Sequence, residues 1–506
     1  MPTELDSRLR AACDLMIPEV REAAGLHEYD GHIQDLSPTG MRAGLERLGR
    51  GERLPDSHDE AHLSTVEDHL RATYGELDTH RRNPLPHVAN LDLACYDRDY
   101  APEETRRRAK LAHLERWPDA VDAALSSLDA VNAPVAAALL DAVRGLAASI
   151  PADAGEAGKR AREAHARLVA HMKTRARDGD PEPAIGGAAL ARLMSSAEGM
   201  PVDLVRLGEQ ADTERDRLMG MLSEACRTID PGRPPLDVAR YLALDHPDVD
   251  QVMTEARAET NAVIAFTRER NLVPYLDGQC VVGPAPESRR WAMAMMVWAA
   301  PGEPDGPSLY HITPPDPSWP AEDVEDWLSV FSRTILPAIT AHEVAPGHFA
   351  HGRAIRRAQT PVRRVLQSGA FAEGWAHYGE ELFIEEGFRA DDPRFAVGVC
   401  TEALIRVTRL ACALGIHTGA MTVDEAAQRF AADTTLTGHA AMSEARRATF
   451  DPMYGQYTWG KLMIQDLREQ ARARWGSAYS HLRFHTAMLD LGSPPLGLLG
   501  TALDRG

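Results

Sequence analysis

Two short segments between residues 341 and 380 contain the residue types that bind a catalytic metal. Residues 341–348 read Ala-His-Glu-Val-Ala-Pro-Gly-His, and residues 371–380 read Phe-Ala-Glu-Gly-Trp-Ala-His-Tyr-Gly-Glu. Two histidines and a distant glutamate are common protein ligands of a catalytic zinc ion, with the fourth position left for water. A glutamate directly after the first histidine is the usual base that acts on this water. These segments therefore favour a zinc-dependent hydrolase.

The spacing of the two histidines is irregular for a zinc site. His342 and His348 are six residues apart, whereas the histidines of His-Glu-x-x-His are four apart and share one helix face. Six steps along a regular helix turn a side chain by about 240°. A helix break at Pro346 and Gly347 would bring His348 back toward a metal, and a wide turn within the helix would do the same. The alternative is that both histidines simply cap a helix end.

Glu373 strengthens the metal hypothesis, because an unpaired carboxylate in an apolar stretch is costly to bury. The alternative is a salt bridge with one of the nearby arginines, which are Arg353, Arg356, Arg357, Arg363 and Arg364. His377 is a rival metal ligand. We expect Glu380 to orient a histidine ligand, as carboxylates around zinc sites commonly do. His351 and His377 are further candidates for a place behind the ligands or beside the substrate.

A hydrolase also needs a donor for the negative charge that develops on the carbonyl oxygen. The aromatic segment Tyr-Gly-Gln-Tyr-Thr-Trp-Gly at 454–460 offers Tyr457 for this role. The alternative for Tyr457 is a tyrosine packed on a helix face.

These motifs resemble those of a large bacterial family known as a domain of unknown function, which is distantly similar to zinc peptidases of the neurolysin and Taq carboxypeptidase type. The resemblance is carried by His-Glu-x-x-Pro-Gly-His and Phe-x-Glu-Gly-Trp-Ala-x-Tyr-x-Glu, and it extends from about residue 83 to the C-terminus. It implies that His342, His348 and Glu373 bind Zn²⁺ and that Glu343 is the catalytic base.

The resemblance also implies the surroundings of the metal. Tyr457 would be catalytic, and His417 and Arg447 would bind the substrate, a peptide or another small amide. The implied fold is mainly α, with two helical lobes around a deep cleft and a small β-sheet near the metal.

Several positions depart from the family pattern, and most lie around the substrate. The family has glutamine near His351 and Tyr454, an acid near Ala413 and a tyrosine near Ala448, while histidine is rare at position 377. These departures suggest a second hypothesis, a zinc-dependent pathway enzyme acting on one amide- or carboxylate-bearing metabolite. A third hypothesis is a non-catalytic helical binding protein, although a glutamate beside both histidines argues against it.

Composition limits the remaining classes of function. The net charge of −20 argues against nucleic-acid and anionic-membrane partners. The same charge could steer cationic substrates, or it could simply be a solvated acidic surface. The six cysteines include no Cys-x-x-Cys pair, which suits a reducing compartment. With no apolar segment of signal-peptide or membrane-span length, we expect a cytoplasmic protein.

The rest of the chain reads as helices with one β-rich region. A length of 506 residues predicts more than one packed lobe, and we divide it into an N-terminal helical segment (1–80), a helical lobe (81–270) and a metal-site lobe (271–506), with the lobes packed as one unit. A helix should begin after Pro102. Apolar runs at 280–282, 291–300 and 308–313 predict a small sheet. One helix is expected from Ala321 to the first metal motif.

Overall fold

The computed structural model describes residues 5–286, 289–290 and 292–506. Within these ranges the chain is mainly helical and its three strands form one small sheet. The prediction of a mainly α protein with a small sheet is therefore confirmed.

The described residues before Arg270 form helices and connecting loops without a strand. The α-helices are α1 (Ser7–Cys13), α2 (Ile17–Ala23), α3 (Pro38–Leu45), α4 (Ser57–Leu70), α5 (Thr79–Arg82), α6 (Leu85–Leu91), α7 (Glu103–Glu115), α8 (Trp117–Ser127), α9 (Ala133–Gly145), α10 (Gly155–Asp178), α11 (Gly187–Glu198), α12 (Leu204–Ile229), α13 (Pro235–Ala243) and α14 (Val252–Glu269). Between them lie the π-helix η2 (Arg71–Glu76) and the 3-10 helices η1 (His27–Tyr29), η3 (Ala94–Asp97) and η4 (Leu146–Ser149). As predicted, α7 begins after Pro102, with Glu103 and Glu104 in its first turn, where the helix dipole favours acids.

The second half contains the sheet and a further set of helices. The strands are β1 (Cys280–Pro284), β2 (Ala294–Val297) and β3 (Ser308–Ile312). The α-helices are α15 (Ala321–Ser329), α16 (Leu336–Glu343), α17 (His348–Ile355), α18 (Pro361–Val365), α19 (Gly369–Glu385), α20 (Arg394–Thr418), α21 (Val423–Asp433), α22 (Gly438–Phe450), α23 (Gln456–Trp475), α24 (His481–Leu489) and α25 (Thr501–Arg505), with 3-10 helices η6 (Gly476–Ala478) and η7 (Leu496–Leu498).

The sheet has the order β1-β3-β2, so β3 is its central strand. β1 pairs with β3 in parallel, with Val282 opposite Tyr310, and β2 pairs with β3 antiparallel, with Met296 opposite Tyr310. These strands arise from the three apolar runs that predicted them, except that Trp291 lies outside the described residues. Tyr310 is fully buried and its hydroxyl lies 3.4 Å from the hydroxyl of Thr340 in α16, which ties the sheet to the helix that carries the first metal motif.

One expectation about the helices is wrong. The helix predicted from Ala321 to the metal motif is divided into α15 and α16, with irregular backbone between Ser329 and Leu336. Pro337 lies in the first turn of α16. Because proline has no backbone N–H to donate and disfavours helical geometry in the residue before it, it starts a helix more readily than it continues one.

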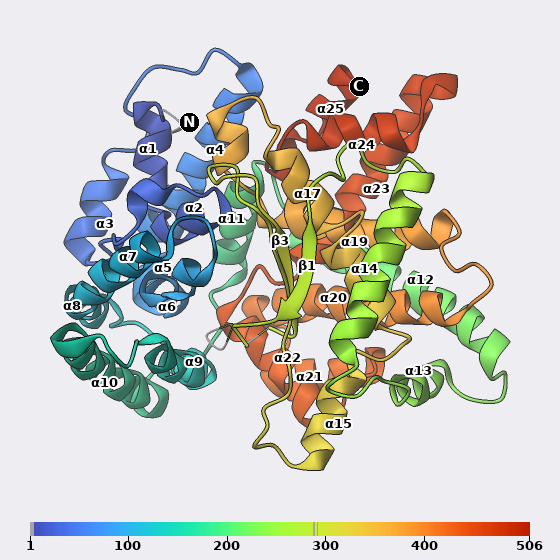
Figure 1. Ribbon diagram of the computed structural model, residues 1–506, viewed down its shortest axis with the longest axis horizontal. Coiled ribbons are helices and arrows are strands. Elements are labelled where there is room, and N and C mark those ends of the chain that lie inside the picture. The colour runs from blue at the N-terminus through green and yellow to red at the C-terminus, as the bar shows by residue number, and fades with distance from the viewer. Residues whose placement is uncertain (1–4, 287–288, 291) are drawn as a thin grey trace.

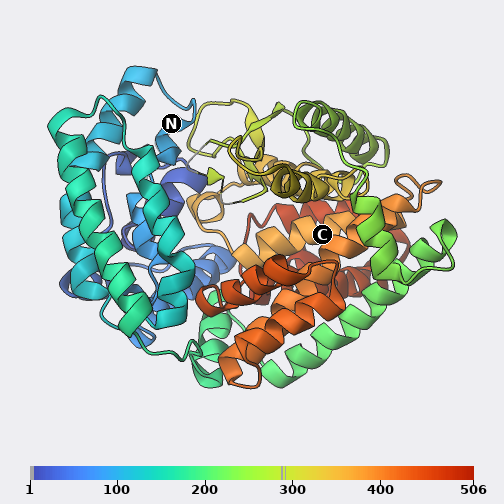
Figure 2. The ribbon, with the colours of Figure 1, turned by 90° about the horizontal axis from the view of Figure 1, so that it is seen from below.

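The molecule has several hydrophobic cores, and one of them joins its two sides, because buried residues between Leu5 and Leu70 pack with Val362, Val365 and Leu366. Figure 1 shows α1–α10 on one side and α12–α14 with α19–α25 on the other, with β1 and β3 near the middle, and Figure 2 shows the same separation from below. One core joins buried residues between Leu91 and Met172, and a second, much larger core joins residues between Leu190 and Ala502. The helices α11–α14, predicted to belong to the 81–270 lobe, therefore share their core with the metal-site segment; the three-domain division itself stays a prediction.

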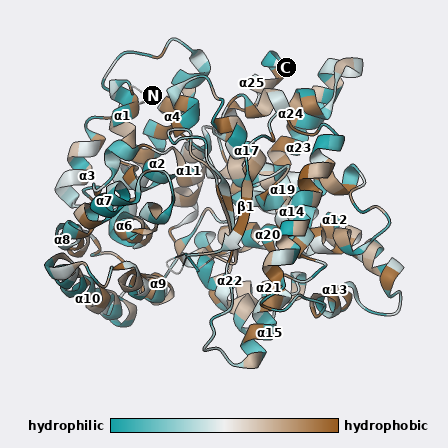
Figure 3. Ribbon diagram, viewed as in Figure 1, coloured by the Kyte–Doolittle hydropathy of each residue, from teal (hydrophilic) through white to brown (hydrophobic). Residues whose placement is uncertain are grey.

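The helices at the edge of the molecule have one apolar face each. Figure 3 shows polar and apolar residues alternating along α10 and α12. In α10 the buried residues Ala161, Ala164, Leu168 and Met172 follow the helical period. This pattern lets α10 bury one face in the core between Leu91 and Met172.

Candidate metal centre

The structure brings His342, His348 and Glu373 together. His342 lies in the last turn of α16, His348 is the first residue of α17, and Glu373 lies in the second turn of α19. One ligand atom from each residue lies within 4.8 Å of the others. Oε2 of Glu373 is 3.4 Å from Nε2 of His342 and 3.3 Å from Nε2 of His348. The three potential ligand atoms thus converge on one point.

A break between two helices overcomes the six-residue spacing. α16 ends at Glu343 and α17 begins at His348, so the histidines do not share a continuous helix. A Cβ atom on Gly347 would lie 1.7 Å from the carbonyl oxygen of His342, so this close approach needs glycine. The indole of Trp375 donates a hydrogen bond of 2.9 Å to the carbonyl of Pro346. Of the two backbone solutions expected, the structure has the helix break.

Glu380 lies behind His342 and fixes the orientation of its ring. Its Oε1 is 2.7 Å from Nδ1 of His342, and its Oε2 accepts a 2.8 Å hydrogen bond from Arg406. Burial alone would raise the pKa of Glu380, but the Arg406 charge and the His342 hydrogen bond outweigh it and lower this pKa below the usual range. An ionised Glu380 accepts the Nδ1 proton, so Nε2 of His342 presents its lone pair to the convergence point.

Glu343, the expected base, lies close enough to this group for the charges of His348, His342 and Glu373 to act on it. Only 8% of the surface of Glu343 is exposed, and its Oε2 has no hydrogen-bond partner within the described part of the chain. Burial raises the pKa of Glu343, and the nearby His348 and His342 act against this rise. A carboxylate kept free of partners and less acidic than usual can accept a proton from water.

The donor set fits a zinc ion. Nε2 of His342, Nε2 of His348 and Oε2 of Glu373 are acceptors that face each other, and Oε2 of Glu373 is buried without a hydrogen-bond partner among the described residues. Such a set is satisfied by a cation, and two imidazoles with one carboxylate match zinc.

The salt bridge considered for Glu373 is absent from the described residues. Arg353 binds Asp277 and Asp305, and Arg363 binds Asp56 and Asp59. The other three arginines bind Asp277, Asp305 or backbone carbonyls, and they are Arg356, Arg357 and Arg364. Among the described residues, the charged or chargeable partners of Glu373 are therefore His342 and His348.

His377 and His351 lie outside the converging group. Nδ1 of His377 is 3.7 Å from Oε2 of Glu380, and neither of its ring nitrogens has a hydrogen-bond partner in the described chain. His351 is fully buried, and its Nε2 lies 3.2 Å from the carbonyl oxygen of Gly492. Both histidines therefore lie behind or beside the ligands.

Tyr457 lies beside the metal group, near the start of α23. Its ring is stacked on that of His342, with centroids 6.2 Å apart and an angle of 23° between the planes. The guanidinium carbons of Arg406 and Arg409 lie 5.8 and 5.7 Å from the centre of the tyrosine ring. Burial and the charge of Glu373 raise the pKa of Tyr457 against the opposing effect of the arginines. Tyr457 therefore keeps its proton and can donate it in a hydrogen bond.

The two residues expected to bind substrate, Arg447 and His417, have different surroundings. The charge of Arg447 acts on the pKa of Tyr457, and Arg447 pairs with Asp451 at 3.0 Å. His417 is fully buried, with Nε2 2.8 Å from the carbonyl oxygen of Ala448 and Nδ1 accepting a hydrogen bond from the backbone N–H of Ile185. Both ring nitrogens of His417 therefore have backbone partners, and its contact with substrate stays a prediction.

Two residues of the site had no signal in the sequence. Arg406 reaches Glu380 from α20, 26 residues further along the chain. Trp298 places its ring 6.4 Å from that of His348 and donates a hydrogen bond from Nε1 to the carbonyl of Ala23, at 3.2 Å. Neither belongs to a motif, and only long-range packing brings them to the site.

The fold and site define a mainly helical protein in which two buried histidines and the partly exposed Glu373 lie next to a glutamate whose Oε2 has no partner among the described residues. The chain belongs to the DUF885 family, described as bacterial protein of unknown function, whose model matches residues 18–503. The expected bacterial family is therefore confirmed, over a longer range than the expected one from about residue 83, and the similarity to zinc peptidases stays a prediction. No curated protein matches the chain.

Two solved structures share the fold over the whole chain. One is termed a candidate lipoprotein of unknown function from Shewanella oneidensis, with 20% identity, a TM-score of 0.78, and coverage of 99% of this chain and 100% of that one. The other, termed a candidate lipoprotein from Colwellia psychrerythraea, has 15% identity, a TM-score of 0.82, and coverage of 100% and 99%. Among the described residues, no helix is long and apolar enough to cross a membrane. The cytoplasmic location stays a prediction.

Proposed function

We propose that this protein is a zinc-dependent hydrolase that cleaves peptide or other amide bonds. The observation that carries the proposal is the convergence of His342, His348 and Glu373 beside the partner-free carboxylate of Glu343. The proposal includes the peptidase-like arrangement of two helical lobes around a deep substrate cleft, with no nucleic-acid or membrane partner.

The chain's own groups have distinct parts in the proposed reaction. His342, His348 and Glu373 would hold zinc, which polarises a carbonyl and makes a water molecule more acidic. Oε2 of Glu343 takes a proton from the attacking water and gives it to the leaving amine as the C–N bond breaks. The hydroxyl of Tyr457 donates a hydrogen bond to the oxygen that becomes negative in the tetrahedral intermediate. Glu380 holds the His342 ring in place through Nδ1.

The test is hydrolysis of a mixed peptide library, followed by mass spectrometry, with wild type and the Glu343→Gln variant. We expect cleavage by wild type and loss of cleavage in the variant at unchanged zinc content, because glutamine cannot accept the proton. Glu322→Gln, in the first turn of α15, is the matched control and should retain activity. Full activity of Glu343→Gln would contradict the proposal.

A second candidate keeps the zinc chemistry but narrows the substrate to one small metabolite. A pocket of about 420 Å³ lies beside Ala372, the residue before Glu373, and this is a suitable size for a small ligand. Cleavage of many unrelated peptides would rule this candidate out. A purely non-catalytic binding role has less support, since binding alone does not require the free carboxylate of Glu343.

A further inference from the structure

The loop between β2 and β3 connects the candidate metal centre to the N-terminal segment. Its first residue, Trp298, places its ring 6.4 Å from that of His348. The indole of Trp298 donates to the carbonyl of Ala23, and the backbone N–H of Gly302 donates a 2.9 Å hydrogen bond to the carbonyl of Ala24. A movement of this loop away from the N-terminal segment would therefore move a ring that lies beside a candidate metal ligand.

Glu303 is the charged residue of this loop that faces the N-terminal segment. Its Oε2 accepts hydrogen bonds from the guanidinium of Arg98 and the backbone N–H of Ala300. Its Oε1 lies 3.3 Å from Nε2 of His27. Arg356, at the end of α17, donates to the carbonyl of Glu303 at 3.2 Å. Glu303 thus contacts both the N-terminal segment and the helix that begins with a candidate metal ligand.

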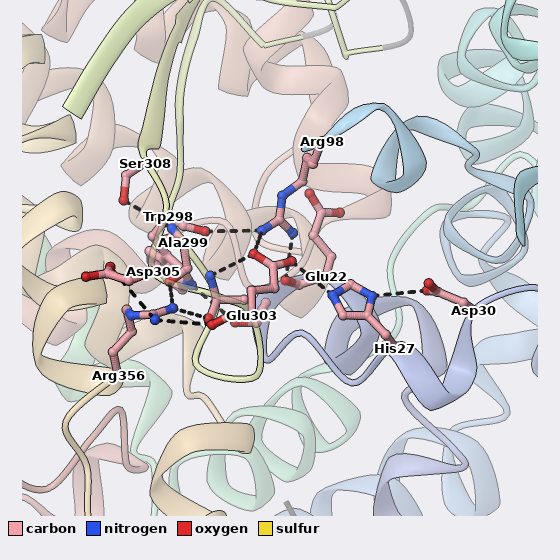
Figure 4. A network of polar contacts seen from close by, with 12 residues as sticks. Glu22, His27, Asp30, Arg98, Trp298, Ala299, Glu303, Asp305, Ser308 and Arg356 are labelled. Carbon is pink, nitrogen blue, oxygen red and sulfur yellow. Dashed lines mark hydrogen bonds and ion pairs between the residues drawn. The ribbon is translucent and has the colours of Figure 1, made fainter. Parts of the chain in front are cut away.

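The ring of His27 lies between two carboxylates, as Figure 4 shows. Nδ1 of His27 is 3.3 Å from Oδ1 of Asp30, and its Nε2 is 3.3 Å from Oε1 of Glu303. In a neutral imidazole one nitrogen donates and the other accepts, whereas an ionised carboxylate only accepts. A neutral ring would therefore turn a lone pair toward one of the carboxylates. The geometry favours the doubly protonated imidazolium, whose two N–H groups match the two acceptors.

The immediate surroundings of His27 hold the ring in this place. The ring of Tyr100 is stacked on that of His27, with centroids 3.8 Å apart and an angle of 4° between the planes. The hydroxyl of Tyr100 donates a 2.7 Å hydrogen bond to Oδ2 of Asp30. Burial lowers the pKa of His27, but the contacts with Asp30 and Glu303 outweigh burial and raise this pKa above its ordinary value.

The other charges near this contact have partners of their own. Arg98 is bound to the carboxylate of the loop. Arg289 pairs with Glu22, and the exposed Glu28, next to His27 in the chain, pairs with Arg10. The charge of His27 therefore acts mainly on the two carboxylates that its ring separates.

We propose that His27 is a proton-dependent latch between the N-terminal segment and the β2–β3 loop. Its imidazolium bridges Asp30 and Glu303, and this bridge keeps the ring of Trp298 at the metal centre. Loss of one ring proton leaves a lone pair facing a carboxylate and loosens the loop.

The direction of the pH dependence follows from the pKa of His27. Because this pKa is raised in the folded protein, the stabilisation by the latch is complete below the unfolded value of about 6.5 and is lost as pH rises through the folded pKa. The latch itself needs neither metal nor substrate. Its effect on catalysis rests on the proposed hydrolase.

Hydrogen exchange of the backbone N–H of Gly302 tests the latch, because this group donates to the N-terminal segment. Wild type and His27→Gln are compared at the same pH, so that the intrinsic effect of pH on exchange cancels. At pH 6 we expect exchange in the variant to be about two- to fivefold faster, as for the loss of one partly exposed ion pair. At pH 9 the ratio should be close to one. A ratio that is the same at pH 6 and pH 9 would overturn the inference.

Two further variants separate the charge of His27 from its packing. His27→Lys keeps a positive charge at both pH values and should keep the slow exchange at both, which a merely structural role of the ring would not produce. His439→Gln, at an exposed histidine in α22, is the matched control and should exchange like wild type. If the His27 variants fail to fold, wild type decides: the protection of Gly302 relative to the central strand β3 should fall from pH 6 to pH 9, and constant protection would overturn the latch.

The two proposals fail in different ways. A pH-dependent exchange ratio without hydrolysis of any amide would support the latch and contradict the hydrolase. Hydrolysis together with the same exchange ratio at both pH values would support the hydrolase and overturn the latch.

Discussion

Oε1 of Glu380 and Nδ1 of His342 are 2.7 Å apart, and this contact connects the metal group to the interior of the protein. Glu380 is fully buried and also binds Arg406. The histidine is thereby held with one nitrogen toward α19 and the other toward the convergence point. The precision of the site thus depends on a residue that would not itself touch the metal.

Glu380→Gln should weaken zinc binding while the fold is kept. The amide keeps the shape of the side chain but loses the charge that fixes the Nδ1 proton of His342, so we expect an affinity lower by roughly 10- to 100-fold. Competition with a chromophoric chelator measures this change. Glu469, an exposed glutamate that pairs with Arg472, gives the control Glu469→Gln, which leaves the contacts of Glu380 in place. Unchanged zinc affinity in Glu380→Gln would contradict the orienting role.

Gly347→Ala should disrupt the helix break. The new Cβ would lie 1.7 Å from the carbonyl oxygen of His342, so the backbone must move; we expect a loss of roughly 3 kcal/mol in the free energy of unfolding, as for severe overpacking, together with loss of zinc. Gly220→Ala, in the interior of α12 with no atom near the added Cβ, is the matched control. It should stabilise the protein by about 0.5–1 kcal/mol. Urea unfolding checks both values, and equal effects would refute the steric argument.

Tyr457→Phe should lower kcat without loss of zinc. The phenyl ring can keep the stacking on His342, but the donor to the developing negative charge is gone. Loss of one such donor lowers kcat by about 10²- to 10³-fold. Steady-state kinetics and metal content are measured together, and a change confined to KM would assign Tyr457 to ground-state binding instead.

Glu198, a buried residue that is not part of the metal group, should make the stability of the protein depend on pH. Burial raises its pKa to about 7, although Ser368 and the backbone N–H of Leu496 donate hydrogen bonds to it. Since the folded-state pKa lies above the unfolded value, the folded protein binds the proton more tightly. The free energy of unfolding therefore falls as pH rises from about 4.5 to 7, by roughly 3 kcal/mol from this group.

Glu198→Gln removes this titration. The stability of the variant relative to wild type should rise between pH 4 and pH 8 by the same amount, measured by urea unfolding at both values. Asp68 pairs with Arg192 near the surface, and Asp68→Asn is the control. The stability of this variant relative to wild type should not rise between pH 4 and pH 8. A difference between Glu198→Gln and wild type that is independent of pH would show that Glu198 is not protonated in the folded state.

The sequence predicted those parts of the structure that depend on local chemistry. Proline and glycine at 346–347 marked the helix break, and short apolar runs marked the strands. Pro337 was a local signal that the helix before the metal motif would be divided. The apolar residues on both sides of Pro337 favoured one continuous helix instead.

Other features depend on distant parts of the chain. Arg406 and Trp298 reach the site through tertiary packing, and Ala372 and Glu19 share a pocket although 353 residues separate them in the sequence. The family motif placed His417 at the substrate, and the motif gave no sign of its two backbone partners, the carbonyl of Ala448 and the N–H of Ile185. Burial and hydrogen bonding of this kind are set by the completed fold.

The zinc content of the purified protein tests the central claim most directly. Mass spectrometric metal analysis of protein expressed with zinc should give one zinc per wild-type chain, and His348→Ala and Glu373→Ala should lose it while their helical circular dichroism remains. Wild-type protein without stoichiometric zinc, or full zinc content in both variants, would contradict the metal centre formed by His342, His348 and Glu373.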